Sequence, residues 1–583
     1  MKNFFKIVFA SMLGYILLAL IMFIVGLSLI ASLSSDPEVS IKPNSILELT
    51  LDQVIPDRAN TNPFENINFM SMKMDQSIGL NDILTYIAKA KKDDNIKGIY
   101  LNLGGCQAGT ATAQEIRNAL RDFKTSGKFI YAYSEMYGQS AYYIASVADK
   151  VFLHREGSID FQGLELQVTL FKNLLDKLGV EMQVVRHGKF KSAVEPYLDT
   201  KISPANREQL SILSQSVWNS LLQDIATDRK ISITQLNTIA DSLLALFPED
   251  ALRTKMVDTL VIRQNVIDIL MRKVGVDKEK DLNLVALTKY IKTEKETIKT
   301  ENKIAVIYAQ GEIGVGKGTD NEIGTENISK AIRQAVEDED VKAIVLRVNS
   351  PGGSVLTSEL IYNEVLLAKN KKPVIASYGN YAASGGYYIS CGCTKIIADP
   401  TTLTGSIGVF GVIPNAQKLL TDKVGLNFDR VVTNKNAGFI SGVRPMSAYE
   451  KMVMQKNIEK IYANFIGKVA KGRNMTLAQV DSIAQGRVWS GIDAKRIGLV
   501  DEFGGLQYAI AQAAKMVKLD QYRIKEYPKQ KDSFSQLMET FGEAKAHTIE
   551  SELGEYKEVY QVVKQLQKSK GVQARLPYLL NIQ

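Results

Sequence analysis

The chain contains an internal repeat, which constrains its fold more than any other feature. Residues 96–145 align with residues 341–390 without a gap, and IKGIYLNL at the start of the first segment matches VKAIVLRV at the start of the second. Shorter matches follow in the same order: YYI at 142 and 387, GSI at 157 and 405, and DKLGV at 176 with DKVGL at 422. Self-similarity of this length indicates two copies of one structural unit.

Each copy has the pattern of an α/β domain. A β-branched run is followed by a Gly-rich turn and then by a segment with apolar residues at helical spacing, such as Leu360, Ile361, Val365 and Leu366. A second apolar run comes next (KFIYAYS in one copy, KPVIASY in the other), and a turn of small residues opens a further helix. Strands that alternate with helices in this way predict βαβ units and a mainly parallel sheet in each half.

A chain of 583 residues is too long for one hydrophobic core, so several domains are expected. The repeat and the composition suggest these limits: an N-terminal stub and anchor at 1–45, a first α/β repeat at 46–275, a charged linker at 276–300, a second α/β repeat at 301–525, and a helical tail at 526–583. The tail contains an amphipathic stretch with apolar residues at 553, 556, 559, 563 and 566, which we expect to pack on the body or on a neighbouring subunit.

The N-terminus carries a transmembrane signal. Lys2 and Lys6 precede an uncharged apolar run over residues 7–33, which is long enough to cross a bilayer and longer than the apolar part of most cleaved signal peptides. We therefore expect a retained transmembrane helix, although cleavage near Ala31 remains an alternative. The positive-inside rule places the N-terminus in the cytoplasm and the body outside, which is the periplasm in a bacterium with two membranes.

Composition disfavours several function classes. The net charge of +8 is spread over the whole chain without a dense basic block, so no nucleic-acid partner is expected. The chain has three cysteines and three histidines, and no two Cys/His pairs stand at the spacing of a metal site. Few residues are therefore available for a zinc site or for a histidine-based catalytic triad.

The two copies differ at two turns. The second copy has NSPGGS at 349–354 where the first has GGCQAG, so Gly353 aligns with Ala108. The second copy also has AASGGYY at 382–388 where the first has YGQSAYY, so Ser384 aligns with Gln139. Only the second copy therefore offers a serine at this aligned position and a flexible PGG backbone before it.

Ser384 has the features of a nucleophile. It lies between an apolar strand and a probable helix, with little steric cover from Ala383 and Gly385. Backbone N–H groups at a helix N-terminus favour negative charge, and those of Gly353 and Gly385 could form an oxyanion hole. The alternative interpretation is that these small residues only let a helix pack closely on a sheet.

A serine nucleophile needs a base, and the first copy offers one. The segment RHGKFKSAVEP at 186–196 contains His187, Lys189 and Lys191, and Lys191 aligns with Ala437 of the second copy. The first half thus has a lysine at a position where the second has alanine, and the second has a serine where the first has glutamine. This complementarity suggests one site shared by the two halves. Lysine acts as a base only when neutral, and burial lowers its pKa. The residues alone leave open whether Lys189 and Lys191 are solvated surface charges.

At these positions the sequence resembles the signal peptide peptidase A family in its long two-copy form. The resemblance rests on FKSAVEP at 190–196, NSPGGS at 349, AASGGYY at 382 and TGSIG at 404–408, and it extends from the N-terminal anchor to about residue 520. It implies a Ser/Lys dyad with Ser384 as nucleophile and Lys191, rather than Lys189, as general base. It also implies that Ser406 holds the lysine and that the backbone of Gly353 and Gly385 forms the oxyanion hole.

The same resemblance implies a fold of the crotonase/Clp-protease type, duplicated within one chain. It implies a homotetrameric bowl with the dyads inside, anchored in the bacterial inner membrane, that degrades hydrophobic signal peptides left after preprotein cleavage. It implies no cofactor and no metal, and it gives His187 no catalytic role. Two alternatives share parts of this pattern: a crotonase-type acyl-CoA enzyme, which needs neither the serine–lysine pair nor an anchor, and a non-catalytic membrane scaffold, which would not need to keep the pair.

Overall fold

The structure is a computed structural model of the chain. It describes residues 12–18, 20–21, 40–59, 67–68, 73–74, 78–293, 298–530 and 571–575. Among these residues no helix is both long enough and apolar enough to span a membrane. The predicted span at 7–33 and the amphipathic stretch at 553–566 lie largely or wholly outside the described residues.

The first half is built on a six-stranded parallel sheet. Its strand order is β8 (Thr259–Leu260), β6 (Lys150–Ile159), β5 (Phe129–Tyr137), β4 (Ile96–Gln107), β1 (Ser45–Val54) and β9 (Leu284–Ala286). Its main helices are α2 (Leu80–Lys92), α3 (Thr110–Lys124), α4 (Gln139–Ala145), α8 (Ile233–Asp241), α9 (Pro248–Arg253), α10 (Arg263–Val274) and α11 (Leu287–Tyr290). The β-branched runs of β1, β4 and β5 are buried because helices cover the sheet.

The second half repeats this arrangement in an eight-stranded sheet. Its main path is β19 (Val488–Ser490), β17 (Leu403–Gly405), β15 (Val374–Ala383), β13 (Val341–Ser350), β10 (Lys303–Gln310) and β21 (Arg523–Tyr527), with β16 (Lys395–Ala398) and β20 (Glu502–Phe503) off the path. Its helices are α12 (Thr325–Glu337), α13 (Val355–Lys369), α14 (Gly385–Ser390), α15 (Ala448–Arg473), α16 (Leu477–Ile483), α17 (Gly491–Arg496) and α18 (Leu506–Met516). Only the β17–β19 pair is antiparallel. The prediction of tandem α/β units with mainly parallel sheets is confirmed.

A third sheet joins the two halves. Its order is β12 (Glu322–Ile323), β11 (Glu312–Ile313), β14 (Gly352–Ser354), β22 (Gly571–Arg575), β18 (Val409–Asn415) and β7 (Glu181–His187). Strand β7 belongs to the first half, yet it pairs antiparallel along its whole length with β18 of the second half. The sequence analysis did not anticipate this sheet, because its strands are short and pair over long sequence distances.

Two ranges differ from the sequence-based expectations. The charged segment at 276–300 is not only a linker, since its apolar residues Leu284–Ala286 form β9 and complete the first sheet beside β1. In the tail expected to be helical, the described residues include the end of β21 and the strand β22, whose backbone at 571–575 pairs with β14 and β18. The remaining short elements are α5 (Lys172–Leu178), α6 (Glu195–Leu198), the pair β2 (Ile67–Asn68) and β3 (Lys73–Met74), three 3-10 turns (Ser192–Val194, Leu244–Leu246, Glu279–Asp281) and a π-turn (Leu419–Lys423).

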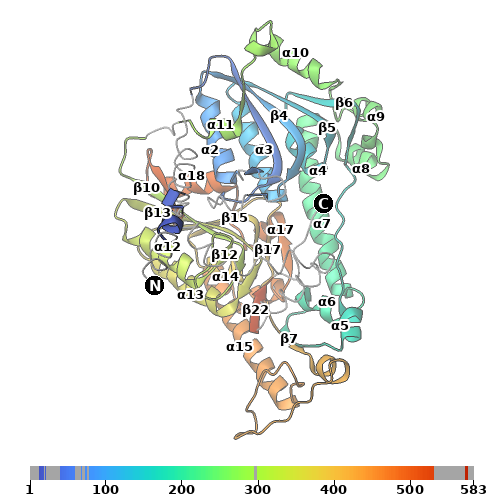
Figure 1. Cartoon of the computed structure of the whole chain (residues 1–583), viewed down its shortest axis with the longest axis vertical. Helices are drawn as coiled ribbons and strands as arrows, with labels where there is room; N and C mark the ends of the chain where they lie inside the picture. Colours follow the sequence, from blue (N-terminus) through green and yellow to red (C-terminus); the bar gives the residue numbers. More distant parts are fainter. Residues whose placement is uncertain are drawn as a thin grey trace, which may run out of the picture.

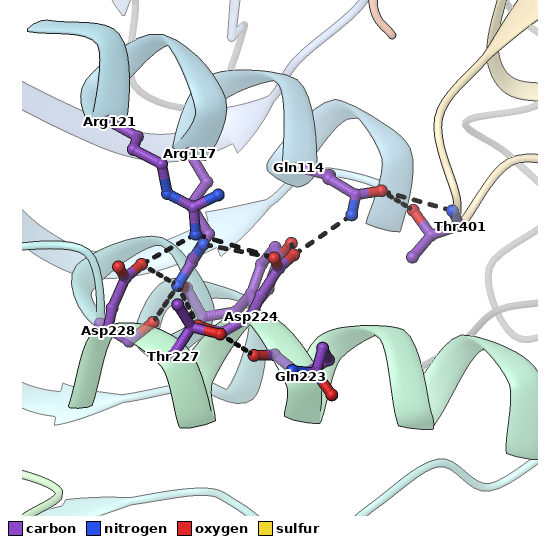
Figure 2. Close-up of polar contacts among 10 residues, drawn as sticks. Gln114, Arg117, Arg121, Gln223, Asp224, Thr227, Asp228 and Thr401 are labelled. Atoms are coloured by element: carbon purple, nitrogen blue, oxygen red, sulfur yellow. Dashed lines mark hydrogen bonds and ion pairs between the residues drawn. The ribbon is translucent and has the colours of Figure 1, made fainter. Parts of the chain in front are cut away.

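The halves pack against each other through polar as well as apolar contacts. Arg347 of β13 is fully buried and donates to Asp57 Oδ1 (2.7 and 2.9 Å) and to Glu115 Oε1 (2.5 Å), both from the first half. Gln114 of α3 accepts hydrogen bonds from the backbone and hydroxyl of Thr401, as Figure 2 shows. Buried groups of opposite charge on the two halves therefore fix their relative position.

Helix α7 (Pro204–Arg229) also connects the halves. It runs along one side of the molecule from the first half toward the second (Figure 1). Near its C-terminus Asp224 and Asp228 pair with Arg117 and Arg121 of α3 (Figure 2). In its middle Ser216 shares a 2.7 Å hydrogen bond with Ser490 of β19 in the second half. Helix α7 is therefore held by contacts with both halves, and it extends to the segment that carries Lys191.

Candidate active site

Ser384 occupies a strained turn between β15 and α14. Its backbone has φ +55° and ψ −111°, a region that non-glycine residues rarely adopt. The turn is held because the Ser384 N–H donates to the Gly405 carbonyl (2.8 Å) and the Ser384 carbonyl accepts from the Tyr388 N–H (2.8 Å). Strained residues of this kind concentrate at functional sites, where the surrounding structure keeps them in place. The turn directs the hydroxyl to the carboxyl end of the sheet.

Lys191 reaches this hydroxyl from the other half of the same chain. It follows β7, so the antiparallel pairing of β7 with β18 carries it to the second half. Its Nζ lies 2.9 Å from Ser384 Oγ, 3.0 Å from Ser406 Oγ and 3.1 Å from the Ser406 carbonyl oxygen. Ser406 follows β17 and also has a positive φ, +48°. The structure therefore brings three of the expected site residues together.

The environment of Lys191 favours the neutral amine. The side chain is fully buried, and burial lowers its pKa well below the usual value of 10.5. Apolar side chains of Ala193, Val194 and Phe410 form a buried cluster beside it, and the Phe410 ring centre is 5.9 Å from Nζ. The three hydrogen-bond partners of Nζ are uncharged oxygens, and no carboxylate is among them. Burial of this kind increases the fraction of the neutral amine, which is the form that can accept a proton.

The number of partners suits both protonation states of the amine. A protonated amine has three N–H groups, one for each of the three oxygens. A neutral amine has two N–H groups and one lone pair, so it can donate twice to Ser406 and accept from the Ser384 hydroxyl. Proton transfer between Ser384 and Lys191 therefore needs no rearrangement of the heavy atoms.

Two glycines enclose the lysine side chain. A Cβ added to Gly486 would lie 2.6 Å from Lys191 Cβ, and one added to Gly408 would lie 3.2 Å from Lys191 Cδ. Gly486 has φ +79°, and its N–H donates to the Ile407 carbonyl at 2.8 Å. Only glycine lets both backbones approach so closely, and the close approach leaves no room for water around the stem. Gly408 ends the TGSIG motif found in the sequence, whereas Gly486 was not expected, because a single glycine in a loop carries no specific signal.

A buried polar network holds the segment that contains Lys191. Ser192 Oγ donates to Asn206 Oδ1 (3.0 Å), and Gln209 Nε2 donates to Ser192 Oγ (2.9 Å) and to the Phe190 carbonyl (3.2 Å). Glu195 accepts from Asn206 Nδ2 at 2.8 Å. Asn206 and Gln209 lie in the first turns of α7 and were not among the expected site residues. The sequence did contain a signal for such a network: the KSAVEP segment has polar residues that would be costly to bury without hydrogen-bond partners.

The expected oxyanion donors also lie together. Gly353 lies in β14, and Gly385 is the first residue of α14. A Cβ added to Gly385 would lie only 3.1 Å from the Gly353 nitrogen, so the two backbones are adjacent. Gly352, with φ +101°, turns the chain immediately before them. This placement next to Ser384 suits backbone N–H groups that stabilise a negative oxygen.

The other two basic candidates lie apart from this cluster. His187 Nδ1 is 2.7 Å from Glu459 Oε2, and its ring stacks on Tyr462 with centroids 3.8 Å apart. Lys189 is exposed, and its ammonium group lies 5.2 Å from the centre of the Phe190 ring. Among the described residues no group of three or more His, Cys, Asp or Glu side chains could hold a metal ion.

Comparison with known proteins agrees with this fold. The model of peptidase family S49 matches residues 122–277 and 367–520, once in each half, and the model of the Clp protease family matches residues 294–402. The chain is similar to "Protease 4" of Salmonella typhi (41% identity over 78% of this chain and 74% of that protein) and of Haemophilus influenzae (35% identity over 76% and 74%). It is also similar to "Serine protease SPPA, chloroplastic" of Arabidopsis thaliana, with 32% identity over 82% of this chain and 70% of the relative. The chain therefore belongs to peptidase family S49 and is a serine protease with a duplicated Clp-protease-like fold.

Proposed function

We propose that this protein is a membrane-anchored endopeptidase that cleaves hydrophobic signal peptides with a Ser384/Lys191 dyad. The observation that carries the proposal is the 2.9 Å contact between the buried Lys191 Nζ and Ser384 Oγ. Neither alternative, an acyl-CoA enzyme or a scaffold, has a use for a buried lysine held against a strained serine.

In the first step the Ser384 hydroxyl attacks the carbonyl carbon of the scissile bond while Lys191 takes its proton. The negative oxygen of the tetrahedral intermediate is held by the N–H groups of Gly353 and Gly385. Removing one such donor in a serine protease typically raises the activation free energy by about 2.7–4 kcal/mol.

The intermediate then collapses, and protonated Lys191 gives its proton to the leaving amine. The remaining acyl-enzyme is an ester on Ser384. Lys191, neutral again, accepts a proton from water as the water attacks this ester. The bond between the acyl carbon and Ser384 Oγ then breaks, Lys191 returns the proton to Oγ, and the carboxylic acid product leaves. Ser406 positions the amine throughout, because its hydroxyl and carbonyl oxygens accept hydrogen bonds from Nζ.

Several features support a hydrophobic peptide substrate. A cavity of about 760 Å³ adjoins β14, and its lining combines charged residues, among them Glu312 and Glu359, with the apolar Ile313, Val315, Val355 and Leu356. Val315 and Leu356 are 82% and 64% exposed, so this apolar surface is open to a ligand. The uncharged run at 7–33 supports anchoring in the inner membrane, next to such substrates, with the body on the periplasmic side. The family resemblance supports a homotetramer.

The test uses the full chain in detergent micelles with a synthetic signal peptide, and mass spectrometry to identify the products. The proposed function predicts cleavage within the apolar part of the peptide by the wild type and at least about a 10⁴-fold loss in Ser384→Ala. Ser384→Ala should show the circular dichroism spectrum of the wild type. Equal cleavage by the two proteins would overturn the dyad, and preferential cleavage of a hydrophilic peptide of equal length would overturn the substrate class.

A further inference from the structure

Gln209 is a buried amide side chain that contacts both of the segments that meet at the active site. It lies near the start of α7 and is 1% exposed. Its Nε2 donates to the Phe190 carbonyl (3.2 Å) and to Ser192 Oγ (2.9 Å), which belong to the residues on either side of Lys191. Its Oε1 accepts from the Val488 N–H (3.3 Å) of β19 in the second half. One side chain therefore joins the segment that carries the base to a strand of the other half.

Strand β19 and the residue before it support the turns that carry Ser384 and Ser406. Val488 pairs with Gly405 of β17, and the Gly405 carbonyl accepts from the Ser384 N–H (2.8 Å). The carbonyl of Arg487, the residue before β19, accepts from the Ser406 N–H (2.6 Å). A shift of β19 would therefore displace the two hydroxyl groups that contact the catalytic amine.

The orientation of the Gln209 amide follows from its partners. A carbonyl such as that of Phe190 can only accept, and a backbone N–H such as that of Val488 can only donate. The amide nitrogen must therefore face Phe190 and the amide oxygen must face Val488. Asn206 Oδ1, which also accepts from Nε2 at 3.0 Å, favours the same orientation. A methionine side chain of similar length could make none of these hydrogen bonds.

The site leaves Lys191 little freedom to move. Its Nζ lies within 3.1 Å of three oxygen atoms, and the backbone of Gly486 lies against its side-chain stem. A displacement of about 1 Å in an active site can lower the rate about 100-fold. A loosened segment would also admit water beside the amine, and burial is the reason that the pKa of Lys191 is low.

The charged groups next to this network, Glu195 and Arg487, have partners of their own. Glu195 accepts hydrogen bonds of 2.6 and 2.8 Å from side chains of its own half. Arg487 pairs with Glu208 of α7 at 3.5 Å. The neutral Gln209 amide therefore holds the segment in place without adding a charge near the base.

We infer that Gln209 is a positioning residue, whose amide sets the distance from Lys191 to Ser384 and Ser406 by bridging the KSAVEP segment and β19. This inference rests on the proposed Ser384/Lys191 mechanism. The lining of the cavity beside β14 comes from other residues, so Gln209 acts on the chemical step through Lys191 rather than on substrate binding.

The test compares the full-length wild type with Gln209→Met in detergent micelles, using the synthetic signal peptide. Because the variant removes the bridge but keeps the length of the side chain, we expect kcat to fall about 10- to 100-fold with little change in KM. As water reaches the amine its pKa should rise, so the ascending limb of the kcat/KM profile should move to higher pH by at least about half a pH unit.

The position of this limb does not depend on how much of a preparation is folded. Ser192→Ala removes only one acceptor of the Gln209 amide and should move the limb in the same direction by less, which provides the test if Gln209→Met folds poorly. Ser216→Ala is the matched control, because it removes a different hydrogen bond between α7 and β19, the one with Ser490. It should lower the urea midpoint slightly and leave kcat and the limb unchanged.

The outcomes separate the inference from the proposed function. An unchanged kcat in Gln209→Met, a change confined to KM, or a lower kcat with the limb in place would overturn the inference and leave the proposed function standing. An equal shift of the limb in Ser216→Ala would reflect a general loosening of α7 and would also overturn it. A wild type that does not cleave the peptide, or Ser384→Ala that cleaves it equally well, would remove the proposed function itself.

Discussion

Lys191 Nζ and Ser384 Oγ lie 2.9 Å apart, although 193 positions separate the two residues in the chain. The contact depends on the pairing of β7 with β18, which brings a loop of the first half onto the strand ends of the second. Each half alone would lack one of the two groups. The duplication has therefore produced one asymmetric site rather than two equivalent ones.

Replacing Lys191 should abolish activity, whereas replacing Lys189 should not. Lys191→Met keeps the length of the side chain but removes the amine, and we expect kcat/KM to fall by at least about 10⁴-fold, as when a catalytic base is removed. Lys189→Ala removes an exposed side chain and should keep most of the activity. Steady-state kinetics on a fluorogenic peptide would measure both. The reverse result would assign the base to Lys189.

Activity should rise with pH through the lowered pKa of Lys191. Only the neutral amine accepts a proton, and its fraction increases about tenfold per pH unit below the pKa. Because burial lowers the pKa well below 10.5, the plateau of kcat/KM should be reached well below that pH. A pH–rate profile between pH 5 and 10 would show the ascending limb. A limb centred near 10.5 would contradict a desolvated base.

Removing the Ser406 hydroxyl should weaken catalysis without abolishing it. Ser406→Ala deletes one of the three acceptors of Lys191 Nζ, and the loss of one hydrogen bond to the amine should lower kcat by about 10-fold. Because this acceptor favours the charged amine, its loss should also move the ascending limb of the pH profile to lower pH. A purely structural role would leave that limb in place, so the profile decides between the two.

Gly486→Ala should disturb Lys191 specifically. The added Cβ would lie 2.6 Å from Lys191 Cβ and 2.7 Å from its backbone nitrogen, so the lysine has to shift and kcat should fall more than 10-fold. Gly127 is a matched control, because it has the same φ of +79° but no atom within 4 Å of an added Cβ. Gly127→Ala should lower the free energy of unfolding by about 1 kcal/mol, because alanine disfavours a positive φ, and it should keep a normal kcat. Equal effects on kcat would contradict the contact.

Arg347→Met should destabilise the protein strongly. It leaves the Asp57 and Glu115 carboxylates buried without their cation, and breaking a buried pair in this way typically costs about 3–5 kcal/mol. Arg333→Met is a suitable comparison, since Arg333 pairs with Glu364 at the surface and should contribute less than about 1 kcal/mol. Urea titration would measure the midpoint and the free energy of unfolding of both variants. Similar midpoints would show that the buried ions do not hold the halves together.

Much of the architecture could be predicted from the sequence, because it depends on local patterns. The β-branched runs at 96 and 341 are the buried parallel strands β4 and β13, and the helical spacing after them corresponds to α3 and α13. The segment Leu284–Ala286 was missed because three apolar residues in a charged run become a strand only beside β1. The strand at 571–575 was missed for the same reason, since its partners lie far away in the sequence.

The sequence by itself determined that the chain has two α/β copies and that only the second has a serine at the position of Ser384, where the first has Gln139. It also reduced the candidates for the base to a short basic segment, without choosing between Lys189 and Lys191 on physical grounds. The tertiary structure distinguishes the two lysines, because only the fold determines which side chain is desolvated: Lys191 is buried beside Ser384, and Lys189 is exposed. Gly408 and Gly486 enclose Lys191 away from water, and Ser384 and Ser406 are its nearest polar partners. Burial, unlike periodicity, is a property of the assembled chain.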